Sequence, residues 1–295
     1  MERENFLRTL LYERIPGTFG VPEEVEPFVK LTKVLEVFTK IEGEYNLNEA
    51  QERLVGGQSC LVVLNHPNLV RTYDSAWIVK ELEANPETRA IMLARGFREG
   101  RKAGKWGQAV PKGIETMGIK TIDIWREKDD FSEEVCKLNN PASLREAIRI
   151  LRNGGVVAYY PEGKRSKQMI EAKPGLAKLA RRAGFVLPIT SCKEGLKGAI
   201  KVHAPIEVEP LVARLEQIDK QHADQIFEDM VMLTVASALP KQQQGFYREG
   251  LELLELLFQH RDAKIEMAEI EKYTTRWFQV ANAEFILSTT SNQLG

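Results

Sequence analysis

Three polar positions of this 295-residue chain carry side chains suited to acid–base chemistry and anion binding. They are His66, Arg126 and the charged segment 162–166. Each follows a short apolar run, and the run ends two residues before it. A neutral imidazole can take a proton from an alcohol, and an arginine can bind a phosphate through two parallel hydrogen bonds. These residue types predict a site where a hydroxyl group is activated beside a bound anion.

Asp74 is the acidic residue best placed along the chain to assist His66. A carboxylate on the second ring nitrogen would fix the tautomer and stabilise the imidazolium. Asp74 also precedes a predicted helix over 75–82, where the same side chain would act as an N-cap. Both roles stay open for Asp74. His66 could instead have a purely structural role, with its ring hydrogen-bonded to a backbone carbonyl. The other polar residues at the strand ends favour a catalytic role for His66.

The remaining candidates would bind the substrate. Glu162 could accept hydrogen bonds from a polyol or orient Arg165, and Gly163 suits a tight turn where the backbone approaches a ligand. Arg126 could instead form an ion pair at the surface without binding substrate. The charged residues of 162–166 could likewise belong to a solvated loop. The predicted substrate-binding residues are Arg126, Glu162, Gly163, Lys164, Arg165 and Ser166.

Short apolar runs alternate with helical patterns through the middle of the chain, which predicts an α/β fold with a mostly parallel central sheet flanked by helices. The runs are 60–64, 89–94, 118–124, 156–160, 185–190 and 199–208. One intervening helix is predicted to begin at a capping box of Ser143 and Glu146 and to end at Asn153-Gly154. Parallel strands bind ligands beyond their carboxyl ends, so His66, Arg126 and 162–166 should converge there.

The flanking regions show helical periodicity without strand-like runs. In the C-terminal region, helices are predicted over about 213–238, 246–260 and 262–287. The predicted organisation is an N-terminal helical segment (1–57), an α/β core (58–209) and a C-terminal helical segment (210–295). The N-terminal helix could pack over the core or lie on a membrane, and its mixture of Lys and Glu favours packing.

Composition narrows the class of protein. With 43% hydrophobic and 28% charged residues and a net charge of −1, the chain is typical of a globular protein with no overall attraction to nucleic acid. Three cysteines without a CxxC pair indicate free thiols in a reducing, cytoplasmic compartment. No apolar run approaches the ~20 residues that span a bilayer, so any membrane contact would be peripheral. Residues 162–201 hold ten Lys/Arg against three Glu, which indicates an anion site or solvated helix faces.

Taken in order, these motifs resemble the glycerolipid acyltransferase family, whose members acylate glycerol 3-phosphate and 1-acylglycerol 3-phosphate. The family shows Asn-His followed by Asp, a strand ending in Arg, the block Phe-Pro-Glu-Gly-Thr-Arg-Ser, and an apolar strand with a central Pro. The corresponding residues are Asn65-His66 with Asp74, Gly118 to Arg126, Tyr160-Pro161-Glu162-Gly163-Lys164-Arg165-Ser166, and Val186-Leu187-Pro188-Ile189. The resemblance covers about residues 58–209, roughly half of the chain.

Three features depart from the family pattern. Asp74 lies eight residues after His66 where the family has five, and three extra residues make almost one helical turn of ~3.6 residues. Lys164 replaces the family's Thr. Two residues, Ile124 and Trp125, come between the family's strand motif and Arg126.

The resemblance implies an O-acyltransferase of phospholipid biosynthesis in which His66 and Asp74 form the general base. It implies acyl-CoA or acyl-carrier protein as donor, glycerol 3-phosphate or a lysophospholipid as acceptor, and neither a cofactor nor a metal. Two alternatives remain open: a metal-dependent hydrolase using His66, Asp74 and Glu162, and an inactive homologue that binds lipids or anions. The hydrolase is disfavoured because no second histidine stands nearby.

Overall fold

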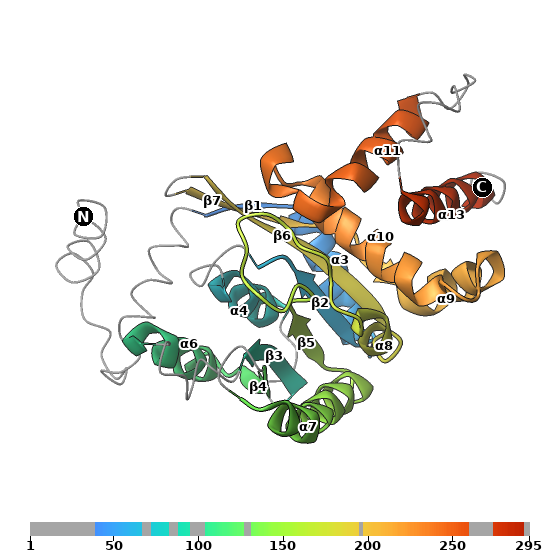
Figure 1. Ribbon diagram of the computed structural model, residues 1–295. Coiled ribbons are helices and arrows are strands. Elements are labelled where there is room, and N and C mark those ends of the chain that lie inside the picture. The colour runs from blue at the N-terminus through green and yellow to red at the C-terminus, as the bar shows by residue number, and fades with distance from the viewer. Residues whose placement is uncertain are drawn as a thin grey trace.

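The computed structural model describes residues 39–66, 72–82, 88–94, 104–126, 131–194, 197–259 and 274–291. They form one mixed sheet with helices on both faces (Figure 1), which confirms the predicted α/β class. The N-terminal helix predicted upstream of residue 39 lies outside the described residues. Within the described ranges, no helix combines the length and hydrophobicity needed to cross a membrane.

The sheet has eight strands in the order β1-β7-β6-β2-β5-β3-β4, with β8 paired to β6. They are β1 (Thr39–Glu42), β2 (Cys60–Leu64), β3 (Arg89–Ala94), β4 (Lys120–Ile124), β5 (Val156–Tyr159), β6 (Phe185–Glu194), β7 (Lys197–Val202) and β8 (Ile206–Glu207). Strands β6, β2, β5, β3 and β4 are mutually parallel, whereas β7 and β8 run antiparallel to β6. Every predicted run forms a strand, and the last one divides into β7 and β8.

Strand β2 lies at the centre of the sheet, and all five of its residues are buried. Leu61 and Val63 belong to the hydrophobic cluster on one face, while Cys60, Val62 and Leu64 belong to the cluster on the other. A parallel strand covered on both faces reads as a continuous apolar run, which is why this strand could be located from sequence.

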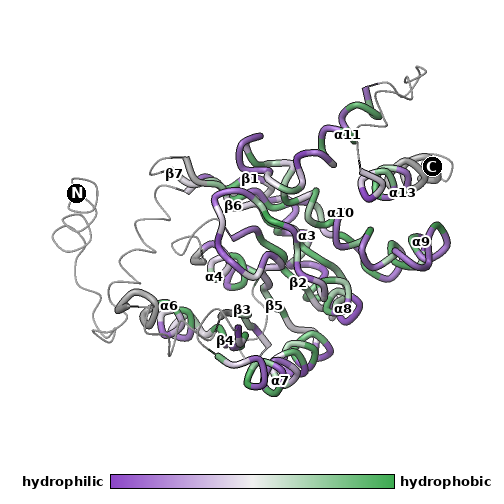
Figure 2. Tube along the Cα trace, viewed as in Figure 1, coloured by the Kyte–Doolittle hydropathy of each residue, from purple (hydrophilic) through white to green (hydrophobic). Residues whose placement is uncertain are grey.

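Helices cover both faces of the sheet. They are α3 (Glu44–Val55), α4 (Thr72–Glu81), α6 (Gly104–Thr116), α7 (Glu133–Arg152), α8 (Leu176–Ala180), α9 (Val208–Ile218), α10 (Ala223–Ser237), α11 (Arg248–Gln259) and α13 (Thr275–Ser291), with short 3-10 turns η3 (Lys241–Gln243) and η4 (Gly245–Tyr247). Helices α3, α4 and α6 supply one cluster and α7, α8 and α10 the other. Helices α9, α11 and α13 pack on α10. Hydrophobic and hydrophilic residues alternate along α7 (Figure 2), as a helix with one buried face requires.

The start of α7 differs from the prediction. The helix begins at Glu133, ten residues before the predicted capping box, and its N-cap is Ser132, whose Oγ accepts a hydrogen bond from the Val135 N–H at 3.2 Å. Ser143 lies inside the helix, and its hydroxyl donates to the carbonyl of Asp123 at 2.6 Å. The predicted end is confirmed, because Asn153 caps the helix and Gly154 follows with a φ of 73°.

Residues 39–42 also differ, because the prediction placed them in a helical segment and they form β1. β1 pairs in parallel with β7, with Thr39 opposite Gly198. The pairing partner lies far along the chain, so the local helical periodicity could not reveal it. The sheet therefore extends upstream of the predicted core boundary at residue 58.

The C-terminal segment is helical, as predicted, in its described parts. The helix predicted over 213–238 is two helices, α9 and α10. Asp219 ends α9, and its Oδ1 accepts hydrogen bonds from the backbone N–H groups of Gln221 and His222, each at 3.1 Å. Most of the next predicted helix, 246–260, forms α11, and only the later part of the last one is described, as α13.

Candidate active site

The structure brings the predicted candidates to the carboxyl ends of neighbouring parallel strands. His66 lies two residues beyond β2 and Arg126 two residues beyond β4, and Glu162 follows β5. The residues of β6 that follow Ile189 lie at the same edge, because Ile189 pairs with Leu64 at the end of β2. Each of these side chains lies at the edge because it closely follows the end of an apolar strand.

Glu162 joins the histidine motif to the charged segment. Its Oε1 accepts the backbone N–H of His66 at 2.8 Å, and its Oε2 accepts that of Ile170 at 3.0 Å. The carbonyl of His66 in turn accepts the N–H of Ser166 at 3.1 Å. Glu162 is only 2% exposed, and this burial raises the pKa of its carboxyl to about 7 against the opposing effect of the two hydrogen bonds. Glu162 thus positions the backbone on both sides of the site.

Asp74 belongs to the same buried edge. It lies in the first turn of α4, which begins at Thr72, so the interpretation of Asp74 as an N-cap is wrong. Its carboxylate accepts a hydrogen bond from the hydroxyl of Ser191. The Asn65 side chain accepts the Ser191 N–H at 2.7 Å and donates to the Ser191 carbonyl at 2.9 Å. Asp74 is therefore tied, through Ser191, to the residue that precedes His66.

Tyr160 contacts the imidazole of His66 and completes this buried polar cluster. The two rings lie 4.4 Å apart between centroids, and the Tyr160 hydroxyl donates to Ser75, next to Asp74, at 2.8 Å. Within the described residues, the buried Nδ1 atom of His66 makes no hydrogen bond. Asp74 therefore contributes a fully buried carboxylate to the cluster without bonding that atom.

Two members of the cluster, Ser191 and Tyr160, were not predicted. Ser191 lies two residues beyond Ile189 on β6, so strand register could have placed it beside Asn65. Tyr160 is the first residue of the Tyr-Pro-Glu-Gly block, but nothing in the sequence signals its ring contact with His66.

A cleft of about 1300 Å³ opens from this cluster between α7 and the segment that links β5 to α8. Its cationic side chains are Arg126, Lys137, Lys164, Arg165, Lys173 and Lys178, and its apolar side chains include Met92, Ile124, Leu144, Tyr159 and Leu179. His66 lies in the cleft lining, together with Gly163. A cleft with both a cationic and an apolar lining suits an amphiphile that carries an anionic group.

Arg126 holds the turn that carries the charged segment. Its guanidinium donates to the carbonyl of Gly163 at 2.7 Å. Gly163 has a φ of 62°, and a Cβ there would lie 3.2 Å from the Lys173 side chain, so glycine keeps this turn compact. The predicted residues Arg126, Gly163, Lys164 and Arg165 all line the cleft with His66.

The two extra residues before Arg126 lie on the cleft wall. Ile124 ends β4, and both it and Trp125 line the cleft. The Asn140 side chain accepts the Trp125 N–H at 2.8 Å and donates to the Trp125 carbonyl at 2.9 Å. Helix α7 thereby fixes the insertion, and Arg126 still reaches Gly163.

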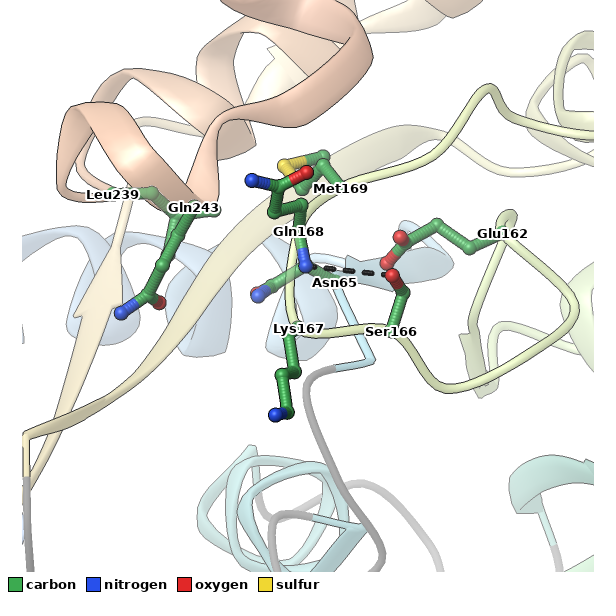
Figure 3. Close-up of a pocket in the computed structure, with 8 residues that line it drawn as sticks. All are labelled: Asn65, Glu162, Ser166, Lys167, Gln168, Met169, Leu239 and Gln243. Carbon is green, nitrogen blue, oxygen red and sulfur yellow. Dashed lines mark hydrogen bonds between the residues drawn. The ribbon is translucent and has the colours of Figure 1, made fainter.

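Glu162 and Ser166 line a second, smaller cavity of about 10 Å³ (Figure 3), which has room for at most one water molecule. The Ser166 hydroxyl accepts the N–H of Gln168 at 3.3 Å, so it shapes a local turn. Leu239 and Gln243 line the opposite side of this cavity. Glu162 and Ser166 thus line this small cavity, and neither is among the described residues that line the larger cleft.

No model of a protein family matches this chain, and no curated protein sequence matches it. In the part of the chain that the structure describes, no three His, Cys, Asp or Glu side chains form a potential metal site.

Proposed function

We propose that this chain is an O-acyltransferase that moves a fatty acyl group from a thioester donor to the hydroxyl of glycerol 3-phosphate or a lysophospholipid. The observation that carries the proposal is a histidine in the lining of a cleft that also holds both cationic and apolar side chains. The donor is acyl-CoA or acyl-carrier protein, as the resemblance to the glycerolipid acyltransferases implies.

In the proposed reaction, His66 takes the proton of the acceptor hydroxyl while its oxygen attacks the thioester carbonyl. The new ester C–O bond forms, the C–S bond breaks, and the imidazolium returns the proton to the leaving thiolate. The resemblance gives Asp74 the role of stabilising the imidazolium, and its carboxylate is fully buried in the same cluster. No covalent enzyme intermediate is required.

The cleft lining would orient the acceptor and donor. Arg126, Lys164 and Arg165 supply cationic donors for the acceptor phosphate, and the apolar wall between β4 and α7 accommodates an acyl chain. Such positioning can contribute up to about 7–11 kcal/mol to catalysis in ideal cases. A lysophospholipid acceptor would be met at a membrane surface, so we place the enzyme in the cytoplasm with peripheral membrane contact.

The test is a screen of acyl acceptors with both classes of donor, using wild type, His66→Ala and His222→Ala. His222 lies at the start of α10 and is 40% exposed, so its replacement is a matched control. We expect wild type and the control to form ester, and His66→Ala to lose about 100-fold or more with an unchanged unfolding midpoint.

Near-normal turnover by the His66 variant would contradict the mechanism. Release of free fatty acid without ester formation, dependent on a stoichiometric metal, would instead identify a hydrolase.

A further inference from the structure

Residues 163–175 form an irregular segment between β5 and α8, which we call the site segment. Hydrogen bonds from the C-terminal part of the chain fix its position. The Met169 N–H donates to the carbonyl of Gln243 at 2.8 Å, and the Met169 carbonyl accepts the N–H of Phe246 at 2.9 Å. The Ala172 N–H donates to the hydroxyl of Tyr247 at 2.9 Å. The segment that carries Lys164 and Arg165 thus takes its path from groups about 75 residues later in the chain.

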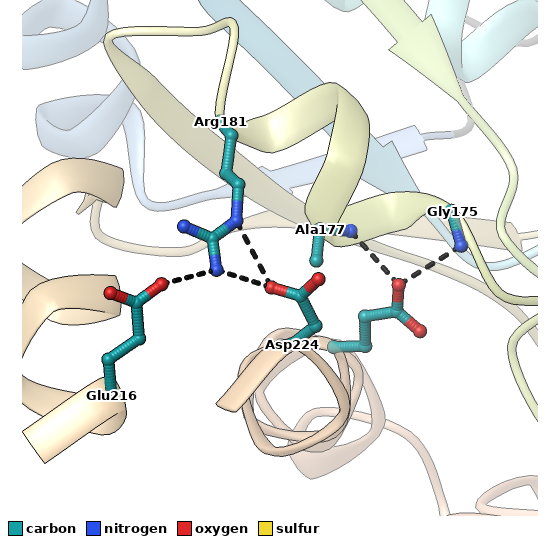
Figure 4. A network of polar contacts seen from close by, with 6 residues as sticks. Gly175, Ala177, Arg181, Glu216 and Asp224 are labelled. Carbon is teal, nitrogen blue, oxygen red and sulfur yellow. Dashed lines mark hydrogen bonds and ion pairs between the residues drawn. The ribbon is translucent and has the colours of Figure 1, made fainter. Parts of the chain in front are cut away.

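Helix α10 holds the far end of the site segment (Figure 4). The Glu228 carboxylate accepts the N–H groups of Gly175 at 3.1 Å and Ala177 at 3.0 Å. Just beyond, Arg181 pairs with Asp224 at 2.5 Å and Glu216 at 2.8 Å. The start of α8 is therefore fixed to α10, and the residue after its end is fixed to α9 and α10.

Arg276 on α13 connects this framework to the middle of the site segment. Its guanidinium bonds both carboxylate oxygens of Asp229, at 2.6 and 2.7 Å, and also pairs with Glu171. Burial alone would lower the pKa of Arg276, but its bonds to the two carboxylates raise it overall, so the guanidinium stays charged. It also stacks 4.9 Å from the centroid of the Phe246 ring.

Glu171 lies between two residues of the site segment whose backbone N–H groups are bonded to other parts of the chain. The residue before it, Ile170, donates its N–H to Glu162, which in turn holds the backbone of His66. The residue after it, Ala172, is bonded to Tyr247. A displacement of Glu171 would therefore move the peptide groups that position the carboxylate behind His66.

We propose that Arg276 is a positioning residue for the cleft, acting through Glu171 to fix the site segment and the cationic side chains that it carries. This inference rests on the proposed function and gives the C-terminal helices a role in it. The Glu171 side chain is 52% exposed, whereas that of Asp229 is 1% exposed. Replacing Arg276 itself would leave Asp229 as a buried unpaired charge and destabilise the whole protein, so Glu171 is the residue to change.

The experiment compares full-length Glu171→Gln with Glu252→Gln. The control breaks the Arg248–Glu252 pair on α11, whose side chains are 54% and 40% exposed. Hydrogen exchange of peptides covering residues 163–175 reports the site segment without any substrate, and steady-state kinetics report the cleft. We expect the Glu171 variant to exchange there up to about 5-fold faster and to raise the acceptor KM more than it lowers kcat, with global stability near that of the control. Glu171→Asp should restore part of both effects.

Exchange in this peptide equal to wild type would overturn the inference, as would faster exchange with unchanged acceptor KM and kcat. If the wild type transfers no acyl group to any acceptor, the proposed function fails. The exchange comparison then still decides whether the Glu171–Arg276 pair fixes the site segment.

Discussion

The carboxylate of Glu162 accepts the backbone N–H of His66 at 2.8 Å, although the two residues are 96 positions apart. The second carboxylate oxygen is bonded to Ile170, so both oxygens are used by backbone donors. An amide in place of this carboxylate would offer only one acceptor. One of the two N–H groups would then face an N–H₂ group.

Glu162→Gln is therefore expected to lose about 1–3 kcal/mol of unfolding free energy, the usual cost of a buried donor without its acceptor. Because the peptide that carries the imidazole would shift, kcat should fall by about 10- to 100-fold. Urea unfolding and steady-state kinetics measure the two effects. A variant with wild-type stability and turnover would show that this bond does not position His66.

Glu162 also predicts a pH dependence of stability. Burial raises the pKa of the Glu162 carboxyl from its ordinary value of 4.5 to about 7, so between these pH values the folded protein holds more protons than the unfolded chain. Its contribution is fully present below pH 4.5 and is lost as the pH rises through about 7, by roughly 3 kcal/mol.

Unfolding free energies of wild type and Glu162→Gln, measured at about pH 5 and about pH 8, isolate this contribution. The stability of wild type relative to the variant should fall between the two pH values. A difference that is independent of pH would contradict the raised pKa.

Asp74 and Ser191 can be separated by two substitutions. Asp74→Asn removes the buried charge and should lower kcat at least about 10-fold while changing KM less. Ser191→Ala keeps the carboxylate but removes its hydroxyl donor, so it should cost about 1–3 kcal/mol of stability with a smaller loss of turnover. Kinetics and urea unfolding of both variants make the comparison. If Asp74→Asn changes stability alone, the carboxylate has only a structural role.

Gly245 permits the contact between η4 and the site segment. Its φ is 53°, and a Cβ at this position would lie 2.0 Å from the Met169 carbonyl oxygen. Gly57 is a matched control, because its φ is 86° and a Cβ there would meet no atom within 4 Å. Gly245→Ala should lose about 2–4 kcal/mol and Gly57→Ala about 1 kcal/mol, measured by chemical unfolding. Equal losses would show that this close approach is not required.

The sequence predicted the strands well because each central strand is a continuous apolar run bounded by polar residues. β2 and β3 begin and end where predicted, since their burial on both faces leaves a clear local signal. β1 was missed because its stability comes from pairing with β7, a partner that local periodicity cannot show. The same limit applies to Ser143, whose spacing to Glu146 imitates a cap although its hydroxyl bonds a neighbouring strand.

For the candidate site, the sequence located the side chains at the strand ends but not the contacts between them. The Arg126–Gly163 bond and the Glu162–His66 bond each join a side chain to a backbone group. Nearly every residue type has such backbone groups, so the sequence does not show which residue will be the partner. The connection from Arg276 to the site segment was hidden for a different reason, because its side-chain partners Asp229 and Glu171 lie 47 and 105 residues away along the chain. Gly245 approaches Met169 and Tyr247 bonds Ala172, and these contacts likewise involve backbone groups of residues far apart along the chain.

The strand order also bears on how the chain folds as it is synthesised. β2 emerges early, yet both of its neighbours, β5 and β6, are encoded about 90 and 120 residues later. At a synthesis rate of about 5–20 residues per second, roughly 6–25 s pass between the synthesis of β2 and that of its neighbour β6. During that interval an unpaired run of Cys60–Leu64 would be exposed to other nascent chains, so this protein should depend on chaperones at the ribosome more than a fold built from sequential hairpins.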